Sequence, residues 1–402
     1  MKKICILRML ICISVVMVML RISVKAEARS IQVEDVNVIS ESKDEVLEEN
    51  KKEADKVYEM VEKMKDNNEI LRELDVEEFV EGLNDKDGFD LEKNKIIRAA
   101  KKVLLKEIAE TGKLMGVIVV IAIVCSLLKH LQDAFKENRV SDIAYFTCFA
   151  SMIVVISKSF YISISIASNA VNGISDFMYA IVPVMIVLFA SIGNVTQAIF
   201  MDPILIASIN ICITIISKVI FPMITLSFVL SFVNNLSEDY KIGRLSSIIK
   251  SSVLWIQGIM MTIFVTILTI RSIASATMDD VTIKAAKFAV DSAVPVVGKT
   301  LSDAISTMAG YTLLLKNSIG TLGMVVIILV MLSPIIKLFC ISGIYKVTGA
   351  LLQPISDKRL TDSIDSVGNC ITLILACVIC TTVMTFIMVA VLTATGKGII
   401  SV

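Results

Sequence analysis

The chain is poor in the residues that most enzymes use for catalysis and metal binding. Its 402 residues include a single histidine, a single tryptophan and six prolines. One histidine leaves no histidine-rich metal site and no pair of histidines for acid–base chemistry. Phosphate-binding loops, the Gly-x-Ser-x-Gly motif and the His-Glu-x-x-His motif are also missing from the sequence. The sequence therefore predicts a protein that is not an enzyme and that holds no cofactor or metal.

An excess of positive charge is missing too, because 39 Lys and Arg residues balance 39 Asp and Glu residues. This excludes a basic nucleic-acid binder, which needs a cationic surface for phosphate. The charges are unevenly distributed, since 25 of the 39 acidic residues lie between Glu27 and Lys113. The part that follows is strongly apolar, and hydrophobic residues make up 55% of the whole chain. This excludes an ordinary soluble enzyme, and we expect most of the chain to lie in a lipid bilayer.

Residues 1–28 have the layout of a secretory signal peptide. A basic start and a short apolar run, Met9 to Leu20, precede small residues at Ala26 and Ala28. An uncleaved membrane anchor is the alternative. A signal peptide places residues 29–112 outside the cytoplasm, whereas the basic residues before the first span favour the opposite orientation under the positive-inside rule. Because the leader is the more specific signal, we expect an extracytoplasmic N-terminal domain.

The polar segment 29–112 is predicted to be a small helical domain outside the membrane. From Leu47 onward, apolar residues recur at three- and four-residue spacing, which is typical of an amphipathic helix. A heptad seam for a partner helix is the alternative. A turn-rich break follows, and then a second helix from Leu91 toward Lys113. The apolar residues of the first helix are Leu47, Ala54, Val57, Val61, Met64 and Leu71.

The rest of the chain predicts an all-α, multi-pass helical membrane protein of about seven spans, because a span needs about 20 apolar residues. The run 204–234 is too long for one straight crossing and carries Lys218 and Pro222, so we expect a kink or a break there. Residues 273–318 are more polar and predict an amphipathic or re-entrant segment. The seven apolar runs are 114–131, 143–168, 176–196, 204–234, 253–273, 319–341 and 370–394.

Four of the six prolines suggest an internal tandem repeat. Pro183 and Pro295 each stand between two valines and are 112 residues apart, and Pro222 and Pro334 have the same separation. Arg-Leu-Ser and Arg-Leu-Thr connectors follow in the two copies. Such repeats build many transporters, with sites near broken helices at the repeat interface. If each unit crosses the membrane an odd number of times, the two units have inverted orientations. If the number is even, their orientations are parallel. The predicted divisions are 113–142 (first helix and loop), 143–252 (unit 1), 253–369 (unit 2) and 370–402 (final helix and tail).

Four basic residues lie within or beside the apolar runs: Lys158, Lys218, Arg271 and Lys337. A charge in a membrane helix costs about 3 kcal/mol or more unless it faces protein or water. Arg271 and Lys337 are near helix ends, which favours snorkelling of their long side chains to the membrane surface. For Lys158 and Lys218, snorkelling is one alternative. The other is a role in lining a polar path or in pairing between subunits.

The second unit resembles the stage III sporulation protein AE family, and the resemblance extends from about residue 114 to 394. The leader and the short polar domain also suit that family. The family has no catalytic residues that could be transferred to this chain, so none are assigned. The stretches that carry the resemblance are Lys287-Phe288, Val294 to Gly298, Leu301 to Asp303 and Leu314 to Asn317.

The resemblance implies a multi-pass subunit in the mother-cell membrane of a sporulating bacterium. It implies a channel or secretion-like complex that joins the mother cell to the engulfed forespore and is needed for forespore development. The implied partners are other stage III membrane proteins of the same operon, a separate ATPase among them, and a forespore membrane protein. The alternative is an autonomous secondary transporter built from internal repeats.

Overall fold

The computed structural model is almost entirely helical where it describes the chain, and those residues contain no strand. This confirms the predicted all-α membrane fold. The leader, Leu47, Ala54 and Pro295 lie outside the described residues. The described residues are 57, 59–65, 69–72, 86–134, 139–191, 195–236, 242–293 and 298–394.

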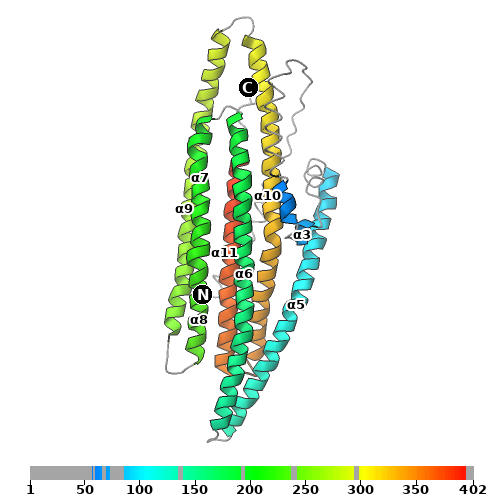
Figure 1. Cartoon of the computed structure of the whole chain (residues 1–402), viewed down its shortest axis with the longest axis vertical. Coiled ribbons are helices and arrows are strands. Elements are labelled where there is room, and N and C mark those ends of the chain that lie inside the picture. Colours follow the sequence, from blue (N-terminus) through cyan, green and yellow to red (C-terminus); the bar gives the residue numbers. More distant parts are fainter. Residues whose placement is uncertain are drawn as a thin grey trace.

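Long helices lie side by side along the long axis of the molecule (Figure 1). The elements are α3 (Glu69–Arg72), α5 (Lys86–Ala134), α6 (Arg139–Ser191), α7 (Val195–Ile215), the π-helix η1 (Ile216–Ile220), α8 (Phe221–Leu236), α9 (Gly243–Ala293), α10 (Gly298–Leu352) and α11 (Lys358–Ala394). Helix α7, the π-helix η1 and helix α8 form one continuous rod, and from α5 onward each rod is antiparallel to the one before it.

Among the described residues, six helical segments are long and apolar enough to cross a membrane, close to the seven predicted from the sequence. The difference arises in α6, where the predicted run 143–168 and residues 176–191 of the next run lie in one unbroken helix. No proline separates the two runs, and Gly173 does not interrupt the helix. The six segments are Lys101–His130, Ile143–Leu188, Pro203–Asn235, Gly243–Ile270, Thr312–Leu352 and Lys358–Thr393.

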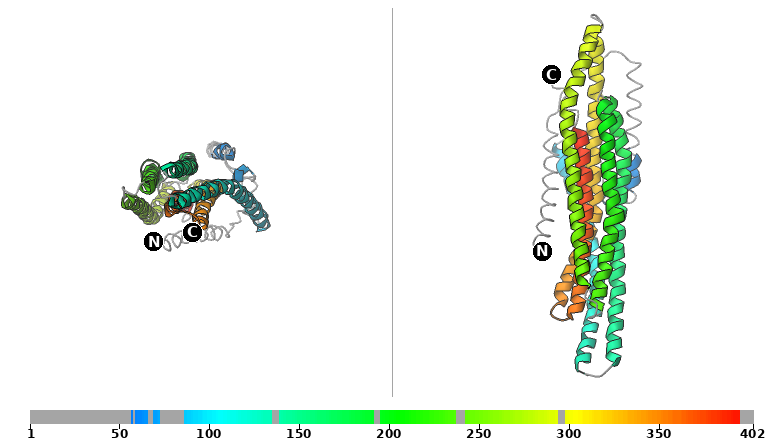
Figure 2. Two further views of the ribbon diagram at one scale, coloured as in Figure 1. Left: turned by 90° about the horizontal axis from the view of Figure 1, so that it is seen from below. Right: turned by 90° about the vertical axis from the view of Figure 1, so that its left-hand side faces the viewer.

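Helices α10 and α11 form the centre of the bundle. They pack against each other as an antiparallel hairpin, with α5 and α6 against one side of it and α8 and α9 against the other. Ile371, Ile374 and Val378 on α11 are fully buried in the resulting core. Figure 2 shows the same layering along and across the bundle axis.

The predicted amphipathic helix packs its apolar side onto this bundle. Val57, Val61 and Leu71 are buried and belong to the main hydrophobic core, while α3 contacts α10 and α5. On the exposed side, Lys63 donates a hydrogen bond to Glu59 at 2.7 Å, which lowers the pKa of that carboxyl. The apolar spacing therefore serves contacts within this chain, as expected for an ordinary amphipathic helix.

Several predicted divisions fall inside continuous helices. The second polar-domain helix and the first span are both part of α5, so the boundary at 112/113 lies within it. The boundary at 252/253 lies within α9. Each predicted repeat unit then crosses the membrane twice. An even number of crossings corresponds to units in parallel orientation. Arg244 and Arg359 of the repeated connectors both stand at the second residue of a helix. The repeat itself stays a prediction.

The more polar segment 273–318 is helical at both ends rather than irregular. Helix α9 continues to Ala293 and α10 begins at Gly298. The two helices extend beyond the neighbouring ones at one end of the molecule (Figure 1). At a rise of about 1.5 Å per residue, the 55-residue α10 is about 80 Å long, against about 30 Å for the hydrocarbon core. The bundle therefore projects well beyond a bilayer.

Candidate functional site: charged residues in the membrane helices

Lys337 on α10 is paired with an acidic residue of another helix. Its Nζ lies 3.3 Å from Oε1 of Glu107 on α5. The Glu107 side chain is only 10% exposed and that of Lys337 is 28% exposed. Snorkelling, which the sequence favoured for Lys337, is therefore not what holds this side chain. A half-buried pair of this kind fixes α5 against α10, because losing either partner leaves a charge without compensation.

Lys316 is a second buried cation on α10, and sequence reasoning missed it as a site. It was noted only as part of the Leu314–Asn317 stretch, but the structure buries its side chain completely. Beside it, Oδ1 of Asn317 is buried without a hydrogen-bond partner in the described structure. An ammonium group is retained in a protein interior only where polar groups surround it. This stretch of α10 is therefore a polar site inside the bundle.

Lys218 lies at the centre of the π-helix η1, where the apolar run 204–234 was expected to kink or break. The N–H of Phe221 bonds to the carbonyl of Ile216, five residues earlier. Pro222 has no N–H, so the carbonyl of Lys218 receives no bond from it at the usual four-residue spacing. Oγ of Ser217 is buried without a partner among the described residues. Single π-helical turns are frequent at functional sites, and this one widens the helix in the middle of a span.

The Lys218 side chain itself is exposed on the outside of the bundle. It has 15 residues of the span Pro203–Asn235 before it and 17 after it. At about 1.5 Å per residue, it is more than 20 Å from either end of the span. The half-thickness of a hydrocarbon core is about 15 Å, so snorkelling from a central position is difficult. Lys218 therefore needs water or another protein on its outer side.

Lys158 is also exposed, on α6. Within the described part of the chain, neither Lys158 nor Lys218 forms an ion pair. The structure describes Arg271 as part of α9, but its side chain lies outside the described residues. The three predicted basic residues whose side chains are described are thus not gathered at one site. Lys337 holds two helices together, whereas Lys158 and Lys218 face outward.

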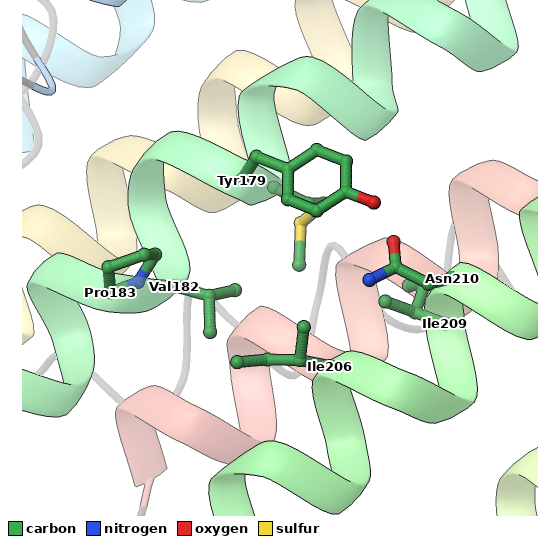
Figure 3. A pocket seen from close by; sticks show the side chains of 7 residues that line it. Tyr179, Val182, Pro183, Ile206, Ile209 and Asn210 are labelled. Atoms are coloured by element: carbon green, nitrogen blue, oxygen red, sulfur yellow. The ribbon is translucent and has the colours of Figure 1, made fainter.

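The four prolines selected from their spacing in the sequence occupy different environments. Pro183 lies inside α6 and borders a small pocket of about 40 Å³ between α6 and α7 (Figure 3). Pro222 is exposed directly after η1, and Pro334 is half-buried inside α10. Pro295 lies outside the described residues. Pro222 and Pro334, the one pair that can be compared, therefore do not share a common local structure.

Polar side chains tie the helices together within the apolar bundle. Ser246 on α9 bonds to the hydroxyls of Ser227 and Ser231 on α8, at 3.0 and 2.8 Å. Nε2 of Gln257 on α9 donates to the carbonyl of Ala376 on α11 at 2.8 Å. Hydroxyls and amides are commonly used in this way between membrane helices. In the described residues, no group of three His, Cys, Asp or Glu side chains could hold a metal ion.

Comparison with known proteins identifies the family to which the chain belongs. The family described as stage III sporulation protein AE matches residues 74–396. The stage III sporulation protein AE of Bacillus subtilis (strain 168) is 29% identical over 301 residues, which cover 75% of this chain and 75% of that protein. No solved structure matches the chain. The match includes all six membrane-spanning segments, and the chain belongs to the stage III sporulation protein AE family.

Proposed function

We propose that this chain is a multi-pass membrane subunit of a channel or secretion-like complex that connects the mother cell with the forespore. Its role is to support forespore development after engulfment. Membership of the stage III sporulation protein AE family carries this proposal. The chain would lie in the mother-cell membrane that faces the forespore, with its N-terminal domain outside the cytoplasm.

The dimensions of the helices support a bridging role. Helices α6, α9 and α10 have 53, 51 and 55 residues, which correspond to about 75–85 Å each. A simple crossing requires about 20 residues. The excess length gives the protein a helical extension outside the bilayer, where a partner anchored in a facing membrane can bind it.

The partners in this proposal are other stage III membrane proteins of the same operon and a forespore membrane protein. A separate ATPase supplies energy, because the sequence of this chain has no phosphate-binding loop. The exposed Lys158 and Lys218 are two positions where such partners or a polar path can meet the membrane helices.

Deletion of the gene tests the proposal. We expect sporulation to arrest after engulfment, with forespores that shrink or stop expressing their genes, as scored by fluorescence microscopy of staged cells. Restoring the full chain should restore spores. Normal spore formation in the deletion strain would contradict the proposed function.

The orientation has its own test. Protease added outside intact vegetative cells that express the chain should remove residues 29–112, because we place them outside the cytoplasm. A cytoplasmic protein serves as the control for intact cells. Protection of the segment, with cleavage only after lysis, would reverse the assignment.

A secondary transporter remains the second candidate, and the π-helix supports it. A lysine beside a proline-containing helix break at the middle of a span is typical of transporter binding sites. A transporter would move a small solute without partners, and Lys218→Met would abolish that flux. Activity that depends strictly on co-expressed partners would instead favour the subunit.

A further inference from the structure

Helix α6 carries a polar stripe along the side that it turns away from the bundle. The stripe residues fall at three- and four-residue spacing, with the half-buried Ser165 at the intervening position between Tyr161 and Asn169, so they share one face of the helix. All six are exposed, whereas Phe160, Ala167 and Val171 on the opposite face are buried. The stripe consists of Lys158, Tyr161, Asn169, Asn172, Asp176 and Tyr179.

A second row of polar residues runs beside the stripe on the next helix. Asn210, Thr214 and Lys218 follow one another at four-residue intervals along α7 and η1, and Thr214 and Lys218 are exposed. Figure 3 shows the side chains of Tyr179 and Asn210 at the same pocket. The pocket therefore joins the stripe of α6 to the row on α7. We call the two rows together the polar face.

The packing of α6 against α7 and α8 sets the level of Lys218 along the polar face. Phe160 stacks on Phe228 with ring centroids 3.9 Å apart, and Tyr179 shares the pocket with Asn210. Counting along the two antiparallel helices between these contacts places Lys218 level with Asn169 and Asn172. The π-helix and its lysine thus meet the middle of the polar stripe.

The polar face is long enough to extend through most of a bilayer. Lys158 and Asp176 are 18 residues apart, or five helical turns, and so lie on one side of α6 about 27 Å apart. The hydrocarbon core is about 30 Å thick. In the described chain, neither of these charges nor that of Lys218 is paired. Lipid cannot satisfy amides and unpaired charges, so something other than lipid covers this face.

We infer that the polar face lines a water-filled passage in the assembled complex. This inference rests on the proposed function and assigns the passage to α6, α7 and η1. Lys218 and Asp176 then act as fixed charges that a passing solute meets, and Lys218 is carried by the widened turn of η1. The α9 side of the bundle faces lipid.

A dry contact between two copies of this face is disfavoured by its charge pattern. Copies in one membrane share one orientation, so parallel packing would place Lys158 against Lys158 and Asp176 against Asp176. Like charges in a low dielectric repel strongly. When copies surround a passage instead, water separates and solvates the same side chains.

Cysteine accessibility in permeabilised sporulating cells tests the passage, because a charged probe must reach the membrane around the engulfed forespore. Asn169→Cys and Asn172→Cys place a thiol on the polar face, and Ser165→Cys adds a near-isosteric change on α6. The probe is a negatively charged, water-soluble methanethiosulfonate. The chain without added cysteines gives the background, because its own described cysteines are buried or half-buried.

The matched controls are Leu254→Cys and Ile259→Cys on the apolar outer face of α9, where both side chains are exposed. Ser227 contacts Ser246 across the α8–α9 hairpin. Counting outward from this contact places Leu254 level with Val219 and Ile259 level with Thr214, on either side of the level of Lys218. The controls therefore lie at the depth of the polar face but on another side of the bundle.

We expect the polar-face thiols to react at least ten-fold faster than the α9 thiols. Equally fast reaction at both sets would mean that this level lies outside the bilayer and would overturn the inference. Slow reaction at the polar face would overturn it too, because lipid or a partner helix would then cover the face. A gene deletion that blocks sporulation together with slow polar-face thiols would retain the proposed function and remove only the passage.

Discussion

Helices α11 and α9 are both apolar enough to cross a membrane, yet they meet very different surroundings. Of the 18 most apolar consecutive residues in the α11 span, 67% are buried inside the protein, against 22% for the α9 span. Helix α11 is enclosed by α6, α8, α9 and α10, whereas α9 exposes Trp255, Ile259 and Ile263. Hydropathy alone therefore identifies a membrane helix but does not show whether protein or lipid covers it. The following predictions test this difference through paired changes.

The largest loss of stability is expected from a substitution where α10 and α11 are in closest contact. A Cβ atom added at Gly320 would meet Oγ1 and Cγ2 of Thr393, the latter at 2.7 Å, whereas a Cβ at Gly258 of α9 meets nothing within 4 Å. Gly320→Val should lower the free energy of unfolding by about 3 kcal/mol through overpacking. Gly258→Val should change it by less than about 0.5 kcal/mol. Denaturation of the purified protein in detergent measures both, and equal stability of the two variants would contradict the close contact.

Breaking the pair between Glu107 and Lys337 should have the next largest effect. Removing one partner of a buried pair costs about 3–5 kcal/mol. Because the Lys337 side chain is 28% exposed, we expect about 2 kcal/mol for Glu107→Ala. Replacing both residues by methionine should recover most of the loss, since no uncompensated charge is left. The same denaturation assay checks this, and a single variant as stable as the parent would argue against the pair.

A smaller effect is expected from the hydrogen bond that joins α9 to α11. Gln257→Ala removes the bond to the Ala376 carbonyl and should cost about 1 kcal/mol. Thr262→Ala on the exposed side of α9 removes only a bond to Gly258 in its own helix and should cost less than about 0.5 kcal/mol. Comparing the two denaturation midpoints separates contacts between helices from contacts within one. A reversed order would mean that the outer side of α9 is the better packed one.

The smallest effect is expected at Trp255, which is 71% exposed. Trp255→Leu exchanges one lipid-facing apolar side chain for another, so both stability and spore yield should stay within error of the parent. Spore counts after heat treatment, together with the denaturation assay, measure this. A loss of spores without a loss of stability would show that a partner covers α9.

The sequence was sufficient where a regular pattern met a single environment. Three- and four-residue spacing predicted that Val57, Val61 and Leu71 share a buried side, and all three are in the core. The apolar run 204–234 was expected to kink or break near Lys218 and Pro222, and the π-helix η1 lies there. Local rules decide both cases, because helical spacing and the missing N–H of proline act within a few residues.

The sequence was insufficient where the outcome depended on distant contacts. The polar residues around Asn172 suggested a gap between two spans, but they lie on the exposed side of one continuous helix. Lys337 was expected to snorkel because it is near a helix end. Its partner Glu107 could not be identified from the sequence, since it belongs to a helix far away in the chain. Lys316 lies near the start of its span and resembled an ordinary boundary charge, although it is fully buried. Tertiary packing decides all three.

Helix α5 has a mechanical consequence. Its 49 residues form one rod of about 74 Å, which begins in the polar segment and ends beyond the first span. Because no joint interrupts the rod, a partner that pulls on its first turns also tilts its far end. The Glu107–Lys337 pair holds the rod against α10 partway along and can act as its pivot. Force applied outside the membrane is thereby delivered to the opposite side of the bilayer.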